Sequence, residues 1–154
     1  MKNLGLIANI LLTGLIAGTM DILAAIFILA GGNAVGVFKG IASGAFGRAA
    51  LDGGTEMVIW GAAFHYFIAL SWTAAYFVLY PRLPFLKTNK WLNGVAYGSV
   101  VWSFMNLIVL PLIGFPQRFS WTGVLTNIAI LIVCIGTPVA VFAEKFYSER
   151  EISY

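Results

Sequence analysis

Residues 4–30 read LGLIANILLTGLIAGTMDILAAIFILA, and Asp21 is the only charged residue in this run. An α-helix rises about 1.5 Å per residue, so an apolar run of about 20 residues can cross the hydrocarbon core of a bilayer. The apolar core of a signal peptide is shorter, at about 7 to 15 residues. We therefore predict that this run is a retained membrane-spanning helix.

The composition of the whole chain agrees with a membrane location. Hydrophobic residues make up 60% of the 154 residues and charged residues only 10%. In soluble domains about a quarter of the residues are charged. With three further apolar runs of sufficient length, the predicted spans are 4–30, 57–80, 91–113 and 121–142. We expect one all-α domain over residues 1–154, a polytopic membrane protein with four transmembrane helices.

The basic residues predict how the chain is oriented. With four spans, both termini and the loop between the second and third spans lie on one side of the membrane. Of the 9 basic residues, the opposite side carries only Lys39, Arg48 and Arg118. Because cytoplasmic loops carry an excess of Lys and Arg, both termini are expected in the cytoplasm. The basic residues are scattered over short loops, which argues against nucleic acid as a partner and leaves membrane lipids.

Two patterns inside the spans bear on their packing. Pro111 and Pro138 interrupt the third and fourth apolar runs and predict a kink in each helix. The glycine pair at 14 and 18 in the first span matches the pair at 94 and 98 in the third. Either two hairpins are related by a pseudo-twofold axis, or the match is a coincidence in a chain with 17 glycines.

The segment between the first two spans, residues 31–56, is too long for an ordinary connection in a compact protein. It has a glycine at every fourth position: Gly32, Gly36, Gly40 and Gly44. On a helix these glycines form one bare stripe, a GxxxG-like spacing that lets another backbone approach. Glycine costs about 1 kcal/mol relative to alanine inside a helix, so something must pack on this one. We expect a short interfacial or re-entrant helix on the outer side; the alternatives are a flexible loop and a dimer interface.

Each span contains one polar side chain that we single out: Asp21, His65, Asn106 and Asn127. Counted from the outer ends of the spans, they lie at roughly 9 to 14 Å depth and thus at about one level. Residues three, four and seven apart share a helix face, and each of these side chains shares its face with small residues. Small residues mark helix-packing faces, so all four are expected to point into the bundle.

Asp21 and His65 are the two titratable members of this set. An ionised Asp at the centre of a spanning helix costs about 2.5 to 3.5 kcal/mol on insertion scales and requires a partner or a proton. One proton shared between the two side chains would meet this requirement and predicts a protonatable or cation-attracting site in an outward-facing cavity. The alternatives are interhelical hydrogen bonds that fix the register, and a metal site, for which one imidazole and one carboxylate are few ligands. We predict no bound metal and no cofactor.

Charged residues also frame the outer loops: Lys39, Arg48, Asp52, Glu56 and Arg118. They are either solvated and paired with one another, or they form a charged vestibule above the cavity. The sequence contains no nucleophile with its base, no phosphate-binding loop and no zinc-ligand spacing, so enzyme chemistry is disfavoured. The single Cys134 is expected to be a small buried apolar residue.

Several segments together resemble a known family. They are IASGAFGRAALDGG at 41–54, the helix that carries His65, and Tyr97-Gly98 followed by Asn106 and Val-Leu-Pro at 109–111. This combination is similar to the small bacterial inner-membrane proteins of uncharacterised function related to YagU, from about residue 14 to residue 116. The resemblance implies four spans in a bacterial inner membrane and implies no biochemical activity.

The functional expectation follows from the polar set. We expect a small pore or carrier element, acting as a homo-oligomer, in which Asp21 and His65 form the polar site. Asn106 and Asn127 would complete its hydrogen bonds. The alternative is a structural or accessory membrane subunit that transports nothing and whose polar residues hold the helices together. A membrane enzyme or a lipid-binding protein is the third interpretation.

Overall fold

The computed structural model describes residues 5–114 and 120–151, and within these ranges the chain is helical without a strand. In chain order the elements are α1 (Leu6–Ala24), η1 (Ala25–Leu29), α2 (Ala34–Phe46), α3 (Ala49–Asp52), α4 (Thr55–Leu79), η2 (Pro84–Lys87), α5 (Lys90–Phe104), η3 (Met105–Val109), α6 (Leu110–Leu112), α7 (Trp121–Leu131), η4 (Ile132–Gly136) and α8 (Thr137–Glu151). The π-helical segments are η1, η3 and η4, whereas η2 is a 3-10 helix.

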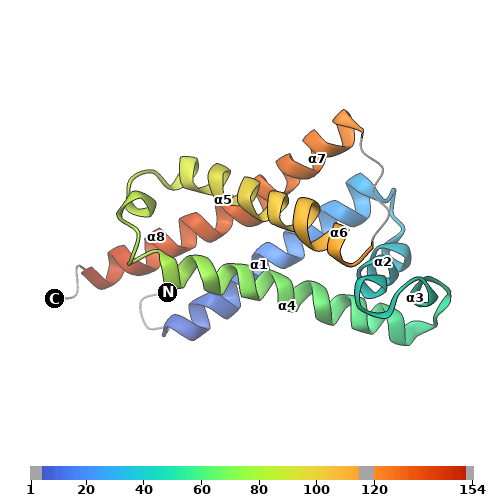
Figure 1. Cartoon of the computed structure of the whole chain (residues 1–154). Coiled ribbons are helices and arrows are strands. Elements are labelled where there is room, and N and C mark those ends of the chain that lie inside the picture. The colour runs from blue at the N-terminus through green and yellow to red at the C-terminus, as the bar shows by residue number, and fades with distance from the viewer. Residues whose placement is uncertain (1–4, 115–119, 152–154) are drawn as a thin grey trace.

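The predicted fold class is confirmed. Four helices are long and apolar enough to cross a membrane: Leu6–Leu29, Thr55–Leu79, Lys90–Leu112 and Trp121–Glu149. They run alternately up and down the bundle, as Figure 1 shows. We name one end of the bundle the α2 end, because α2 and α3 lie there, and the opposite end the η2 end. At the η2 end, Lys90 Nζ on α5 pairs with Glu144 Oε2 on α8 at 2.7 Å.

Side chains at the start of several helices explain where these helices begin. Asn33 Oδ1 accepts a hydrogen bond from the Gly36 N–H at the start of α2, and Asn89 does the same for α5. Ser120 Oγ accepts from Gly123 at the start of α7. Asn and Ser are favoured at this position because their oxygens satisfy backbone donors that have no partner within the helix.

Glycines set the spacing within both hairpins. Gly14 and Gly18 of α1 lie against α4, where added Cβ atoms would come 3.3 Å from Leu70 Cα and 3.0 Å from Ala69 Cβ. Gly94 and Gly98 of α5 lie in the same way against the start of α8 and against η4. In each hairpin the glycine pair of the first helix therefore meets the second helix, which is the small-residue packing expected between membrane helices.

The glycine-rich segment is helical, and α2 lies against α4 (Figure 1). The predicted glycine stripe does not make this contact. Among the described residues, none of the four glycines lies against the backbone of another helix: Gly32, Gly36, Gly40 and Gly44. Instead, Gly61 of α4 lies directly against the carbonyl group of Phe38 on α2. Two helices can approach this closely only where a glycine lies at their crossing point. Here that glycine is Gly61 on α4, and the glycines of α2 are not needed for the contact.

Both prolines inside the spans follow a π-helical segment. Pro111 comes two residues after η3 ends, and Pro138 comes two residues after η4 ends. Proline has no N–H to donate to the residue four positions earlier, so the backbone before it must find other partners. The interruptions predicted at these prolines therefore take the form of widened helical turns.

Candidate functional site

A cavity of about 540 Å³ lies inside the bundle near the α2 end. Pockets for small molecules commonly measure about 300 to 1,000 Å³, so this cavity has the size of a ligand site. The four polar residues singled out from the sequence all line it: Asp21 from α1, His65 from α4, Asn106 from η3 and Asn127 from α7. The structure thus brings together one polar side chain from each span.

The remaining wall of the cavity is mostly apolar. Phe64, Phe67 and Trp72 of α4 line one side, and aliphatic side chains from α2, η3, α6, α7 and η4 line the others. Two lining positions on α2, Gly40 and Gly44, carry no side chain. Among the described lining residues, no Lys, Arg or Glu is present. The chemistry of the cavity therefore depends on four polar groups in an apolar surrounding.

His65 is buried and holds α4 to α1. Its Nε2 lies 2.8 Å from the carbonyl oxygen of Gly18, and because a carbonyl only accepts, Nε2 carries the proton and donates. The imidazole also meets the ring of Tyr66 edge to face, with centroids 5.3 Å apart. Tyr66 in turn shares a hydrogen bond of 3.0 Å with the Thr19 hydroxyl of α1. His65 therefore contributes to the contact between the two helices as well as to the cavity wall.

Asp21 is half-buried, and its carboxylate is not bonded to His65. Within the part of the chain that the structure describes, no hydrogen bond or ion pair joins the two side chains, although they interact electrostatically. The predicted sharing of one proton between them is therefore not what the geometry shows. The physical reason is the Gly18 carbonyl, which the glycine leaves uncovered and which takes the Nε2 proton of His65.

The two amides occupy different local settings. Asn106 lies in the π-helical segment η3, where its Nδ2 donates to the carbonyl of Trp102 at 3.0 Å. Asn127 lies in the regular helix α7 and is half-buried at the cavity. Both side chains place a polar amide group in an otherwise apolar cavity wall.

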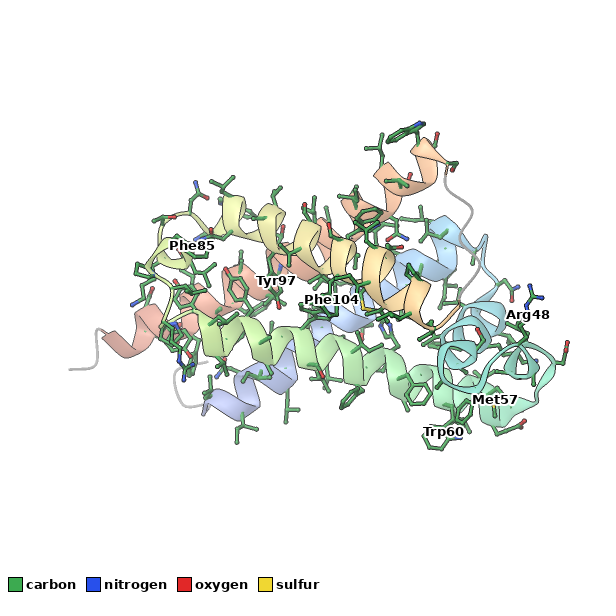
Figure 2. The ribbon with its side chains drawn as sticks, in the orientation of Figure 1. Arg48, Met57, Trp60, Phe85, Tyr97 and Phe104 are labelled. Carbon is green, nitrogen blue, oxygen red and sulfur yellow. The ribbon has the colours of Figure 1, made fainter. Side chains whose placement is uncertain are left out.

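The charged residues considered for a vestibule lie at the same end of the bundle as the cavity, outside its wall. Lys39, Arg48, Asp52 and Glu56 all belong to the α2 end, and none of them lines the cavity. Figure 2 shows Arg48 pointing away from the bundle, and Glu56 Oε1 accepts a hydrogen bond of 2.7 Å from Gly54 N–H at the start of α4. Arg118 falls outside the described residues.

A second group of polar side chains, not singled out from the sequence, lies deeper in the bundle. Thr13 and Thr73 are fully buried, and Tyr76 is 1% exposed. Thr73 Oγ1 donates to Ala69, but the hydroxyls of Thr13 and Tyr76 make no hydrogen bond within residues 5–114 and 120–151. The sequence does contain a pattern that could have predicted their burial. Thr13 is next to Gly14 on a helix-packing face, and Thr73 lies three residues before Tyr76 on one face of α4.

Aromatic side chains separate this deeper group from the cavity. Tyr97 of α5 reaches across to α4, as Figure 2 shows, and its hydroxyl donates to the carbonyl of Trp72 at 2.6 Å. The ring of Tyr76 packs against Tyr97 with centroids 4.7 Å apart. The hydrogen bond and ring contacts therefore hold Trp72 in position, and Trp72 lines the cavity whereas Tyr76 and Tyr97 do not.

Comparison of the chain with protein-family models, curated proteins and solved structures finds no match. Within the described residues no three side chains of His, Cys, Asp or Glu gather as metal ligands. An apolar cavity with one carboxylate, one imidazole and two amides can bind a solute and exchange a proton.

Proposed function

We propose that this chain is a membrane carrier element in which Asp21 is the protonatable group. The observation that carries the proposal is the cavity of about 540 Å³ that all four intramembrane polar side chains line. Polar side chains that only hold helices together make their hydrogen bonds to each other or to backbone across close-packed interfaces. Here a space of ligand size remains beside the carboxylate.

The proposed location is a bacterial inner membrane, with both termini in the cytoplasm. Arg82 and Lys87 lie at the η2 end of the bundle, whereas Lys39 and Arg48 lie at the α2 end. Together with Lys90 and Lys145, the η2 end has the excess of basic residues that marks a cytoplasmic face. The resemblance of residues 41–54 to proteins related to YagU supports the same membrane. The cavity would then face the outer side.

The carrier proposal assigns a physical role to the apolar wall. An ionised carboxylate is costly in such a surrounding unless a proton or a cation accompanies it. A solute that brings positive charge to Asp21 can replace the proton, and the departure of that solute requires a proton to return. Proton and solute movements are thereby coupled through one side chain.

Purified protein in liposomes tests this proposal. Under an imposed pH gradient, with a mixture of inorganic and small organic cations in the outer solution as candidate solutes, wild type should show proton flux that Asp21→Asn abolishes, read by a pH-sensitive dye inside the vesicles. Asp52→Asn is the matched control, because it makes the same chemical change on α3, away from the cavity. Equal flux in wild type and Asp21→Asn, with both proteins folded, would disprove the carrier role.

A structural or accessory role is the second candidate, and one observation favours it. The hydrogen bond from His65 to Gly18 joins two spans and fixes their register. If this role is the main one, His65→Ala should lower the melting temperature or dissociate the protein from an assembly, while Asp21→Asn should change no flux. Melting curves and size-exclusion profiles of the two variants separate the candidates.

A further inference from the structure

Asp21 is the only carboxylic acid among the described residues that line the cavity. Asp21 and His65 are the only titratable side chains among the described lining residues, and Cys134 on η4 is a further titratable group that interacts electrostatically with Asp21. His65 Nε2 donates its hydrogen bond to the carbonyl of Gly18, and no hydrogen bond or ion pair joins His65 to Asp21 within the described residues. No side chain of the described residues forms an ion pair with Asp21, so a ligand of opposite charge would be its direct partner.

The walls indicate what the rest of such a ligand is. A bare metal cation requires several oxygen ligands, and among the described lining residues Asp21 is the one carboxylic acid, with the amides of Asn106 and Asn127 as the other side-chain oxygens. The rings of Phe64, Phe67 and Trp72 instead offer apolar contact area and faces that attract organic cations. The lining thus suits an apolar body that carries one positive charge.

Part of the cavity wall also reaches the outer surface of the bundle. Three of its lining side chains are exposed on the surface: Phe67 at 69%, Leu29 at 45% and Ile113 at 42%. Phe67 lies in the middle of α4, which is one of the four helices that can cross a membrane. A solute that partitions into the apolar layer of the membrane would therefore meet a side chain of the cavity wall at that depth.

We propose that the cavity binds an amphiphilic organic monocation, whose charged group pairs with the Asp21 carboxylate and whose apolar body fills the aromatic and aliphatic walls. This inference rests on the proposed function, because it names the solute class of the same cavity. One proton leaves the Asp21 carboxyl group for each cation that binds, so the net charge in the cavity stays constant. The same proton returns when the cation leaves.

Two probe ions of the same shape and opposite charge test the inference. Purified full-length protein in detergent is incubated with radiolabelled tetraphenylphosphonium or with tetraphenylborate, and bound ion is measured at equilibrium. Tetraphenylphosphonium should bind, with one proton released per cation in weakly buffered solution, and its binding should weaken as the solution is made more acidic. Tetraphenylborate should bind far more weakly.

Variants locate the bound cation. Asp21→Asn should weaken tetraphenylphosphonium binding by at least about thirtyfold, because it removes one partner of a buried charge pair. Asp52→Asn should bind like wild type. Gly40→Leu leaves Asp21 in place but fills the cavity, since a Cβ at this position meets nothing within 4 Å and points into the free space of the lining. It should also reduce binding.

The outcomes are distinct. Equal binding of both ions, unchanged by Asp21→Asn, would mean that the cavity takes any apolar occupant, such as a lipid chain, and would overturn the inference. Proton flux in liposomes that depends on Asp21, combined with no binding of tetraphenylphosphonium, would refute the monocation and leave the carrier proposal standing. Binding that depends on Asp21 without any flux would support the site and refute the carrier.

Discussion

The contact between α2 and α4 makes a sharp prediction about Gly61. A Cβ added to Gly61 would overlap the carbonyl oxygen and carbonyl carbon of Phe38 and would lie 2.9 Å from its Cα. These are backbone atoms, so no side-chain rotation relieves the overlap. To restore an ordinary carbon–oxygen contact of about 3.3 Å, α2 must shift by on the order of 1 Å. Gly61→Ala should therefore displace α2 from α4.

Gly40→Ala is the matched control that isolates the cost of this overlap. Both glycines lie inside helices, so both alanines gain about 1 kcal/mol of helix propensity. Only the alanine at 61 meets a backbone, because a Cβ at position 40 has nothing within 4 Å. Overpacking of this kind costs about 1 to 3 kcal/mol. Because the gain in helix propensity is the same in both variants, this cost is the expected difference between their unfolding free energies. At about 2 to 4 °C per kcal/mol, Gly61→Ala should melt about 2 to 12 °C below Gly40→Ala.

Thermal unfolding in detergent, followed by circular dichroism, measures this difference. Tryptophan fluorescence adds a local reading, because Trp60 on α4 packs edge to face on Phe46 of α2 with ring centroids 5.7 Å apart. A shift of α2 should change the Trp60 emission in Gly61→Ala and leave it unchanged in Gly40→Ala. If Gly61→Ala melts at or above the control with unaltered emission, the close approach of the two backbones does not exist.

Three further changes test other contacts, each by thermal unfolding in detergent. His65→Phe loses the bond to Gly18 and should lower the unfolding free energy by about 0.6 to 2 kcal/mol; an unchanged melting temperature would contradict a role of that bond in stability. Thr13→Val replaces a buried hydroxyl that makes no hydrogen bond within the described residues, so it should be neutral or should stabilise the fold by up to about 1 to 3 kcal/mol. A marked loss of unfolding free energy would show that the hydroxyl does have a hydrogen-bond partner. Lys90→Met should cost at most about 1 kcal/mol, because its pair with Glu144 is partly exposed, and a double-mutant cycle that gives a larger coupling would refute this.

Hydropathy and helical spacing predicted the spans and the inward direction of the polar side chains because both depend on local rules. A segment needs a minimum length to cross a bilayer, and a side chain such as Asn127 shares a face with residues three and four positions away. These rules need no knowledge of which helix lies opposite. These local rules were sufficient to predict that the four polar side chains face one interior, and all four line the cavity: Asp21, His65, Asn106 and Asn127.

Which groups contact each other across two helices depends, in contrast, on where the helices cross. The spacing of residues within one helix does not determine that crossing point. His65 was expected to pair with Asp21, but Gly18 brings its own carbonyl within 2.8 Å of the imidazole. The bare stripe on α2 was expected to make the close contact, but the crossing point falls at Gly61. Thr13 and Tyr76 were passed over because an isolated Thr or Tyr in an apolar run is common, and only the packed bundle shows that both are buried.

The cavity itself depends on interruptions in three of the four spans. Helices with regular turns pack side chains densely and leave few voids. The segments η1, η3 and η4 widen the turns of the first, third and fourth spans, and each contributes lining residues, among them Leu29, Asn106 and Ile135. The second span, α4, is a regular helix from Thr55 to Leu79, and it provides His65 and the aromatic wall. The regular helix α4, packed closely on α1 and α2, therefore supplies a fixed wall, whereas the π-helical turns of the other spans supply the space. Turns of this kind are often found at functional sites. A bundle selected only for close packing would have no reason to place three such turns around Asp21, the one acidic side chain among the described lining residues.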